Sequence, residues 1–162
     1  MNRVIDTNVA IAANGRNTHA SDSCQYRCIE LLEEICNKSS KYRIFLDSNG
    51  LIFEEYSRHL NFHGQPGVGD IFFKYTHDHL YTAGKVVQVT ITNDEDDSKG
   101  FAELPPNSID PSDRKFLAVA VAGNAKIVNA LDSDWYQQRS FVHTLGVKIL
   151  EICPEHVCGN TK

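Results

Sequence analysis

The stretch Arg3-Val4-Ile5-Asp6-Thr7-Asn8 places an aspartate directly after a short apolar run, and the chain repeats this arrangement twice. Asp47 ends the run Ile44-Phe45-Leu46, and Asp132 ends the run 126–131. Short apolar runs of this kind predict buried strands. Ligands in open α/β sheets bind at the carboxyl ends of the strands, so we expect these aspartates to meet in one pocket.

Strand and helix patterns alternate along the rest of the chain. This alternation predicts a three-layer α/β/α fold with a mostly parallel central sheet. We interpret residues 1–153 as one domain with a polar insertion at about 93–110, and we expect the tail 154–162 to be frayed. The expected strands cover residues 1–6, 42–47, 86–92, 126–131 and 147–152, and the expected helices cover 8–14, 21–37, 49–60, 70–82, 111–123 and 134–145.

Composition limits the class of protein. The chain has 162 residues, of which 41% are hydrophobic, and this is enough for one globular domain with its own core. Its formal net charge of −5 argues against a broadly basic nucleic-acid-binding surface but not against a small basic rim. No apolar run approaches a membrane span and no signal sequence is evident, so we expect a cytoplasmic protein without a membrane partner.

The cysteines are expected to be reduced thiols. Their number is odd, and a chain of this size does not need disulfides to hold a small scaffold together. The spacings between them are wider than those of a four-cysteine zinc site, which argues against a bound metal. The five residues are Cys24, Cys28, Cys36, Cys153 and Cys158.

Aspartates gathered in one pocket would repel one another. Two ionised carboxylates about 4 Å apart repel by roughly 4 kcal/mol at an effective dielectric constant of about 20. Such a group is stable only when a cation lies among the carboxylates or protons are shared, and hard oxygen ligands favour Mg²⁺ or Mn²⁺. Asp6 alone could equally be the N-cap of the next helix, but the recurrence at Asp132 favours a metal ligand.

The stretch Asp110-Pro111-Ser112-Asp113 opens the expected helix 111–123. Asp110 is a favoured N-cap and Pro111 suits the first helical position, so we assign Asp110 a capping role. Asp113 begins a helix that is nearly all apolar, so we expect its carboxylate to face inward as a metal ligand. Asp134 could cap the last helix, although its spacing from Asp132 lets both acids approach one cation.

Other polar clusters are less informative. Glu54 and Glu55 are adjacent on the expected helix 49–60 and point about 100° apart, so the helical pattern alone does not separate them. On the residues alone, the favoured interpretation is that both glutamates are solvated. The acidic run 94–97 lacks the other ligands of a calcium loop and is typical of a solvated loop. His59 and His63 have no suitable third partner for a zinc site.

Four segments stand out together along the chain. They are Val4-Ile5-Asp6-Thr7-Asn8-Val9, Leu51-Ile52-Phe53-Glu54-Glu55-Tyr56, Ser112-Asp113-Arg114-Lys115-Phe116-Leu117-Ala118-Val119-Ala120 and Leu131-Asp132-Ser133-Asp134-Trp135. In order and spacing they resemble the PIN domain family of metal-dependent ribonucleases over roughly the whole chain. Two features depart from the family pattern. Ala130 replaces a small hydroxyl residue two positions before the fourth acid, and the segment 61–110 is longer than in the compact toxin members.

The resemblance implies that four acids bind one or two Mg²⁺ or Mn²⁺ ions. Glu55 is preferred to Glu54 because family members often have a tyrosine or another apolar residue directly after the glutamate. Thr7 and Asn8 would not bind the metal themselves but would orient the carboxylates that do. By position, the four acids are Asp6, Glu55, Asp113 and Asp132, with Asp134 as an additional metal ligand.

The resemblance further implies hydrolysis of a phosphodiester bond, in RNA rather than DNA. The metal would lower the pKa of a water and stabilise the leaving oxygen, and Glu55 would complete the metal shell or orient the water. PIN relatives often dimerise, so a homodimer is implied, and an antitoxin-like protein partner stays open. Arg114 and Lys115 are the expected substrate-binding residues, within a rim that also includes Arg58, His59 and Arg139.

Two alternatives stay open. A non-catalytic PIN-like module that binds nucleic acid or protein would have the same fold, and loss of divalent-metal binding would favour it. A Mg²⁺-dependent phosphatase with an aspartate nucleophile would carry Asp-x-Asp at the end of the first strand, where this chain has Asp6-Thr7-Asn8. Cleavage of small phosphorylated substrates would identify the second alternative.

Overall fold

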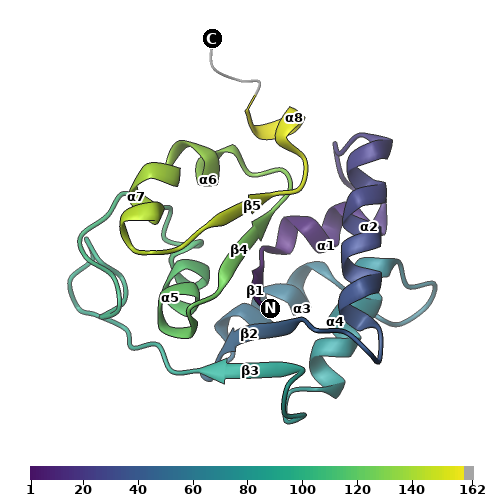
Figure 1. Cartoon of the computed structure of the whole chain (residues 1–162), viewed down its shortest axis with the longest axis horizontal. Helices are drawn as coiled ribbons and strands as arrows, with labels where there is room; N and C mark the ends of the chain where they lie inside the picture. Colours follow the sequence, from purple (N-terminus) through teal and green to yellow (C-terminus); the bar gives the residue numbers. More distant parts are fainter. Residues whose placement is uncertain (159–162) are drawn as a thin grey trace.

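The structure, a computed structural model, describes residues 1–158 and contains a five-stranded sheet with the strand order β3-β2-β1-β4-β5 (Figure 1). Every pair of neighbouring strands is parallel. Helices cover both faces of the sheet, so the predicted three-layer α/β/α fold is confirmed. The strands are Asn2–Ile5 (β1), Arg43–Asp47 (β2), Val86–Val89 (β3), Lys126–Asn129 (β4) and Ile149–Glu151 (β5).

Eight helices surround this sheet within the described part of the chain. They are Thr7–Asn14 (α1), Asp22–Cys36 (α2), Leu51–His59 (α3), Val68–Asp78 (α4), Arg114–Gly123 (α5), Ser133–Gln137 (α6), Arg139–Thr144 (α7) and Pro154–Val157 (α8). In Figure 1, α1, α2 and α4 lie on one side of the sheet and α5, α6 and α7 on the other. The helix α1 packs against α2 and α4, whereas α5 packs against four of the strands, β1 to β4.

The direction of winding reverses between β1 and β4. The first half of the chain builds outward from β1 through β2 to β3, and the second half returns to place β4 and β5 on the other side of β1. Right-handed crossovers then put the helices of the two halves on opposite faces. Such a reversal opens a crevice at the carboxyl ends of the two central strands, where open α/β sheets bind ligands. Asp6 lies at this point, and its backbone N–H donates to the carbonyl of Val128 at 3.0 Å.

The central strands are apolar because helices cover both faces of the sheet. Ile5, Ile44 and Val128 have no exposed surface. Local capping then defines where the helices begin. The Asp6 carboxylate accepts from the N–H of Asn8 at the start of α1, and the Ser21 hydroxyl accepts from the N–H of Cys24 at the start of α2.

Two helix predictions need correction. The helix α5 begins at Arg114 rather than at residue 111, because the Asp110 carboxylate accepts from the N–H and the hydroxyl of Ser112 and forms a turn. Asp110 therefore does not cap a helix. The expected helix 134–145 is two short helices that meet at Gln138, and Asp132 rather than Asp134 caps the first of them.

The segment 93–110 packs against the core, and the tail is more ordered than expected. The insertion contains no helix or strand, but Phe101, Leu104 and Ile109 are buried and join the core. After β5, residues expected to be frayed form α8, whose Val157 is 3% exposed. Residues 159–162, the rest of the predicted tail, lie outside the described residues.

Asp47 does not join the other strand-end aspartates. Its carboxylate accepts hydrogen bonds from the N–H groups of Leu51 at 2.8 Å and Ile52 at 2.9 Å. Gly50 at the N-cap position of α3 has no side chain to do this, so Asp47 satisfies the first turn from outside the helix. The expectation that all three strand-end aspartates share one pocket is therefore wrong for Asp47.

The cysteine prediction is wrong for two of the five residues. Cys24 on α2 and Cys153 directly after β5 form a disulfide across a sequence separation of 129. Cys28, Cys36 and Cys158 are free thiols. The sequence pattern offers no connectivity for residues so far apart, and it misses this link. By restricting the unfolded chain, such a cross-link stabilises a domain by about 2–4 kcal/mol.

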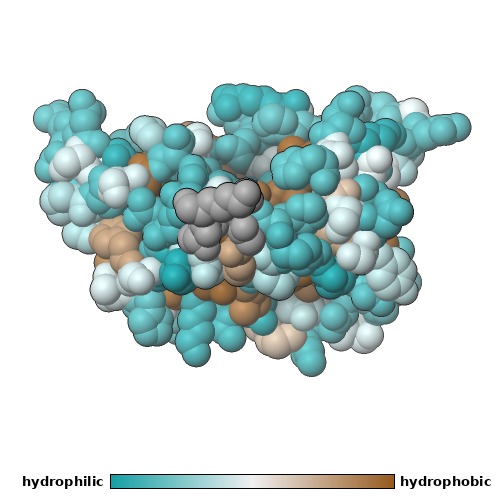
Figure 2. Space-filling model, turned by 90° about the horizontal axis from the view of Figure 1, so that it is seen from above, coloured by the Kyte–Doolittle hydropathy of each residue, from teal (hydrophilic) through white to brown (hydrophobic). Residues whose placement is uncertain are grey.

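The surface is mostly hydrophilic in the view of Figure 2, where apolar residues form small separated patches. The large apolar side chains that are exposed are Met1, Tyr26, Ile71 and Tyr81. None of the helices within residues 1–158 combines the length and the apolar character needed to cross a membrane.

Replacing Asp47 by alanine should destabilise the fold by about 2 kcal/mol. The change leaves two N–H groups at the buried start of α3 without an acceptor. Chemical denaturation measures the effect. Ser48→Ala at the exposed neighbouring position should change the free energy of unfolding by less than about 0.5 kcal/mol. Equal stability of the two variants would contradict the capping role of Asp47.

Candidate metal centre

Three of the predicted site acids meet in the structure. Asp6, Asp113 and Asp132 each offer a carboxylate oxygen, and these atoms all lie within 4.8 Å of one another. Asp6 follows β1, Asp132 follows β4, and Asp113 precedes α5, the helix that packs beneath both strands. The reversal in strand order therefore brings together residues that are far apart in the sequence.

Asp6 is the most buried of the three, with 6% of its surface exposed. One carboxylate oxygen accepts from the backbone N–H of Asn8 at 3.0 Å. The other accepts from the indole N–H of Trp135 at 2.7 Å, and this hydrogen bond is fully buried. The two donors fix the carboxylate in one orientation, and each oxygen keeps a lone pair for a further partner.

Asn8 ties the end of β1 to the loop that carries Asp132. Its side-chain oxygen accepts from the N–H groups of Ala130 at 2.9 Å and Leu131 at 3.2 Å. Its amide group donates to the side-chain oxygen of Asn129 at 2.9 Å. The sequence predicts that Asn8 orients a metal-binding carboxylate. Its side chain instead holds the backbone from which the Asp132 carboxylate projects.

Asn129 completes this scaffold from a fully buried position. Its side-chain oxygen accepts from the N–H of Asp132 at 3.1 Å, and its amide donates to the carbonyl of Asp132 and to the carboxylate of Glu151, each at 2.7 Å. Sequence reasoning missed both Asn129 and Glu151. The signal available was a polar side chain inside each of two otherwise apolar strands, which is unfavourable unless a partner lies opposite.

The structure separates Glu55 from Glu54. The Glu55 side chain is 16% exposed, and its carboxylate accepts from the Thr7 hydroxyl and, at 3.0 Å, from the Lys115 ammonium. The Glu54 side chain is 60% exposed and pairs with Arg58 on the solvent side of α3. Glu55 is thus the glutamate that faces the three aspartates, with Thr7 bound to it as a neighbour.

The other predicted residues lie less centrally. Asp134 is exposed and lies outside the group of three, and its backbone N–H donates to the Asp132 carboxylate at 2.8 Å. Arg114 donates to the carbonyls of Ile109 and Asp97 and so holds the insertion rather than facing outward freely. Lys115 is engaged by Glu55.

Of the other predicted rim residues, two contact neighbouring side chains and one lines the cavity. Arg58 is paired with Glu54, and the Arg139 guanidinium lies 3.9 Å from the ring centre of Tyr136. His59 alone of the five rim residues lines the cavity that contains the three aspartates. The cations available to a polyanion at this cavity are therefore fewer than the sequence suggests.

A cavity of about 360 Å³ opens onto the three aspartates. A second cavity of about 500 Å³ lies against Asp113, Asp134 and Trp135, so Asp113 borders both. The first cavity contains His19, Asn17 and Thr18, which sequence reasoning did not single out. Its complete lining is Asp6, Thr7, Asn8, Ile11, Asn17, Thr18, His19, Glu55, His59, Asp113, Leu131 and Asp132.

Burial and mutual repulsion disfavour the ionised acids. Burial first, and then the charges of Asp132 and Glu55, raise the pKa of Asp6 to about 6, against the opposing hydrogen bonds from Asn8 and Trp135. Burial and the neighbouring acids raise the pKa of Asp113 to about 7, and burial also raises the pKa of Asp132. The pKa of Glu151 rises to about 7 for the same reasons. A bound cation would relieve this repulsion.

Comparison of the chain with protein-family models, with curated proteins and with solved structures found no match.

The pH dependence of stability should report the repulsion at Asp113. Its pKa of about 7 in the folded chain lies above the ordinary value of about 4. The folded state is therefore destabilised when Asp113 ionises. Full stability is present below about pH 4 and is lost as the pH rises to about 7. Without metal, Asp113→Asn should therefore be more stable than the unchanged protein at pH 8, by on the order of 1 kcal/mol after solvent screening, and no more stable at pH 4. Thermal unfolding in a chelator measures both.

Asp110→Asn is the matched control. Hydrogen bonds from Ser112 lower the pKa of Asp110, so its ionised form is favoured in the fold. This variant should gain no stability at pH 8. Parallel stability curves for Asp113→Asn and the unchanged protein between pH 4 and 8 would contradict the repulsion.

Trp135→Phe should weaken Mn²⁺ binding by about 10–100-fold. The change keeps a buried aromatic ring but removes the N–H that orients Asp6, and loss of such an orienting group has this typical effect. Isothermal titration with Mn²⁺ measures it. Tyr136→Phe, at the neighbouring position, should keep the affinity. An unchanged affinity in Trp135→Phe would show that the indole does not support the site.

Proposed function

We propose that the protein is a divalent-metal-dependent nuclease, PIN-like, that hydrolyses phosphodiester bonds in RNA rather than DNA. The observation that carries the proposal is the meeting of Asp6, Asp113 and Asp132 within 4.8 Å where the sheet reverses its winding. Three carboxylates this close at neutral pH need a cation among them or shared protons. The resemblance in sequence motifs supplies the chemistry in which such a set is used.

The ligand set fits Mg²⁺ or Mn²⁺. It consists of carboxylate oxygens alone, which these hard cations prefer. Among the hydrogen bonds of the described residues, none reaches the Asp113 carboxylate, and Asp132 accepts one at a single oxygen. Oxygen atoms therefore remain for a cation on both residues. Asp134 would approach the same ion only from the exposed side.

The residues of the chain would divide the work of hydrolysis. A bound divalent ion would stabilise negative charge on a phosphate oxygen and lower the pKa of a water. Asp6, Asp113 and Asp132 would hold that ion, and Trp135 and Asn8 would keep Asp6 in position. Glu55 lines the same cavity and would orient the attacking water and accept its proton.

Phosphate binding must overcome an acidic pocket. The metal charge offsets part of the repulsion, and polar side chains in the cavity can contact a backbone phosphate or sugar. Asn17 and Thr18 supply an amide and a hydroxyl, and His19 and His59 supply imidazoles. We propose these four rather than Arg114 and Lys115, which the fold engages, as the nearest contacts for the nucleic acid.

A second candidate function is a non-catalytic PIN-like module that binds nucleic acid or protein. One observation favours it. The ammonium of Lys115 lies 3.0 Å from Glu55, so the glutamate is partnered even without substrate or metal. In this alternative the pair is structural, and Glu55 never orients a water. The cytoplasmic location, the homodimer and the antitoxin-like partner belong to the same proposal and stay predictions.

Cleavage of a labelled single-stranded RNA, with and without Mn²⁺, tests the proposal. Asp6→Asn and Asp113→Asn should lose at least about 100-fold in rate, because each removes a charge that holds the metal. Glu55→Gln should lose activity, and Glu54→Gln, at the exposed neighbouring position, should not. DNA of the same base sequence, tested in parallel, decides between RNA and DNA.

The outcomes separate the candidate functions. Metal-dependent cleavage that survives in Asp6→Asn would point to a contaminating enzyme and against this site. Mn²⁺ binding by the three aspartates without cleavage of any nucleic acid would favour the non-catalytic module. Hydrolysis of small phosphate monoesters alone would favour the phosphatase.

A further inference from the structure

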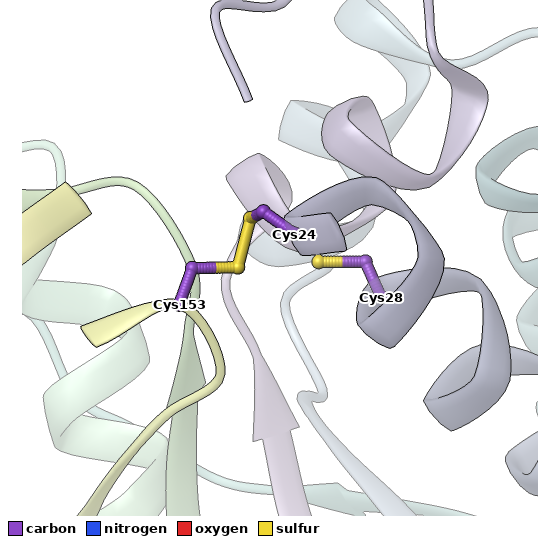
Figure 3. Close-up of side chains that lie close together, drawn as sticks. All are labelled: Cys24, Cys28 and Cys153. Carbon is purple, nitrogen blue, oxygen red and sulfur yellow. A yellow bond between two sulfur atoms is a disulfide. The ribbon is translucent and has the colours of Figure 1, made fainter. Parts of the chain in front are cut away.

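Three buried sulfurs form a second cluster, apart from the carboxylates. The Sγ atoms of Cys24, Cys28 and Cys153 all lie within 4.8 Å of one another, and none of the three residues has exposed surface. Figure 3 shows Cys24 and Cys28 on neighbouring turns of α2 and Cys153 opposite them after β5. The sulfur of Cys28 points toward the disulfide formed by the other two.

Cys28 is poorly suited to attack this disulfide. Burial raises the pKa of its thiol to about 12. The nucleophilic thiolate is therefore disfavoured near neutral pH. The third sulfur therefore contributes little to thiol–disulfide exchange. A different use of three adjacent sulfurs is coordination of a soft metal ion, in which the metal displaces the protons.

We propose that reduction of the Cys24–Cys153 disulfide converts this cluster into a binding site for one soft monovalent cation, Cu(I), held by the sulfurs of Cys24, Cys28 and Cys153. An external dithiol supplies the two electrons and two protons, which cleave the disulfide into two thiols while the dithiol becomes a disulfide. Binding of Cu(I) then releases protons from the thiols that become thiolates. The oxidised chain keeps the site closed.

The number of ligands favours Cu(I) over zinc. Structural zinc sites are almost always four-coordinate, and no fourth side chain joins the three sulfurs among residues 1–158. A trigonal site with metal–sulfur distances of about 2.3 Å separates its sulfurs by about 4 Å. Cys28 already lies within reach, so only Cys24 and Cys153 must move apart once their bond is broken.

A guanidinium lies at the edge of the cluster, within an exposed ion pair. Arg27 lies on α2 directly before Cys28, and its charge acts to lower the pKa of Cys28 against the larger effect of burial. Its guanidinium donates to the carbonyl of Ile152 at 2.9 Å, directly before Cys153. Cu(I) held by two thiolates and one thiol carries one negative charge. Arg27 lies beside it, although its guanidinium is also paired with the carboxylate of Glu155.

The cluster and the carboxylate site select different metals. Hard Mg²⁺ and Mn²⁺ prefer oxygen, whereas Cu(I) prefers sulfur. The two sites can therefore be loaded independently. The inference does not rest on the proposed nuclease activity, and its test uses no nucleic acid.

Competition with a chromogenic Cu(I) chelator tests the site. The whole chain is reduced with a phosphine, which adds no thiol, and is titrated without oxygen. Reduced protein should take one equivalent of Cu(I) from the chelator, and the oxidised protein none. Cys28→Ser should weaken binding at least about tenfold because it removes one of three ligands and leaves the disulfide pair intact. Cys36→Ser, a free cysteine on the same helix, should bind as the unchanged chain does.

Different results would overturn different parts of the proposed Cu(I) site. Unchanged binding in Cys28→Ser, or Cu(I) uptake that also disappears in Cys36→Ser, would overturn the three-sulfur site. Tighter selection of Zn²⁺ than of Cu(I) would overturn the assignment of the ion. Circular dichroism follows the fold of the reduced chain. Recovery of structure on addition of Cu(I) would support the site, and a reduced chain that stays unfolded in Cu(I) would overturn it.

Discussion

The hydrogen bonds of Asn8 to the loop after β4 are the constraint on which the candidate metal centre depends. They connect the residue two positions after Asp6 to the backbone that leads into Asp132. Backbone amides have fixed positions once the strands pair, so the two carboxylates cannot move apart independently. Asn129 repeats the connection from the opposite side and extends it to β5. The acids are therefore forced together by uncharged groups, against their own repulsion.

This balance explains the arrangement around the site. Holding like charges together costs free energy, and the fold offsets that cost with hydrogen-bond donors directed at individual carboxylates. Trp135 donates to Asp6, Lys115 donates to Glu55, and Asn129 donates to Glu151. Asp113 has no such donor among the described hydrogen bonds, and its pKa is raised to about 7. A bound cation would therefore relieve more repulsion at Asp113 than at the carboxylates that already have a hydrogen-bond donor.

Sequence patterns predict the layers of the fold because strands buried on both faces must be apolar. Strand-end position also predicts Asp6 and Asp132, but the same pattern at Asp47 leads to a helix cap. A carboxylate after a strand can bind backbone N–H groups or a ligand, and only the path of the following turn decides between them. The choice of Glu55 depends likewise on how α3 is rotated against the sheet, which its own sequence does not determine.

Contacts between residues far apart in the sequence are not predicted for a different reason. Cys24 and Cys153 are separated by 129 residues, and Asn129 meets Glu151 only because β4 and β5 are neighbours. The sequence around Cys24 and Cys153 does not identify them as partners. Asn129 and Glu151 are each unusual as polar residues in an apolar strand, but neither position says which residue lies opposite it. Such contacts follow from the strand order, and they become predictable once that order is known.

The position of Trp135 gives the site an optical reporter of its own. It is the only tryptophan in the chain, and its indole N–H binds a carboxylate of the three-acid group in a fully buried hydrogen bond. Indole emission responds to nearby charge and to hydrogen bonding of that N–H. Intrinsic fluorescence of the unlabelled protein therefore observes Asp6 directly, with no second tryptophan to dilute the signal.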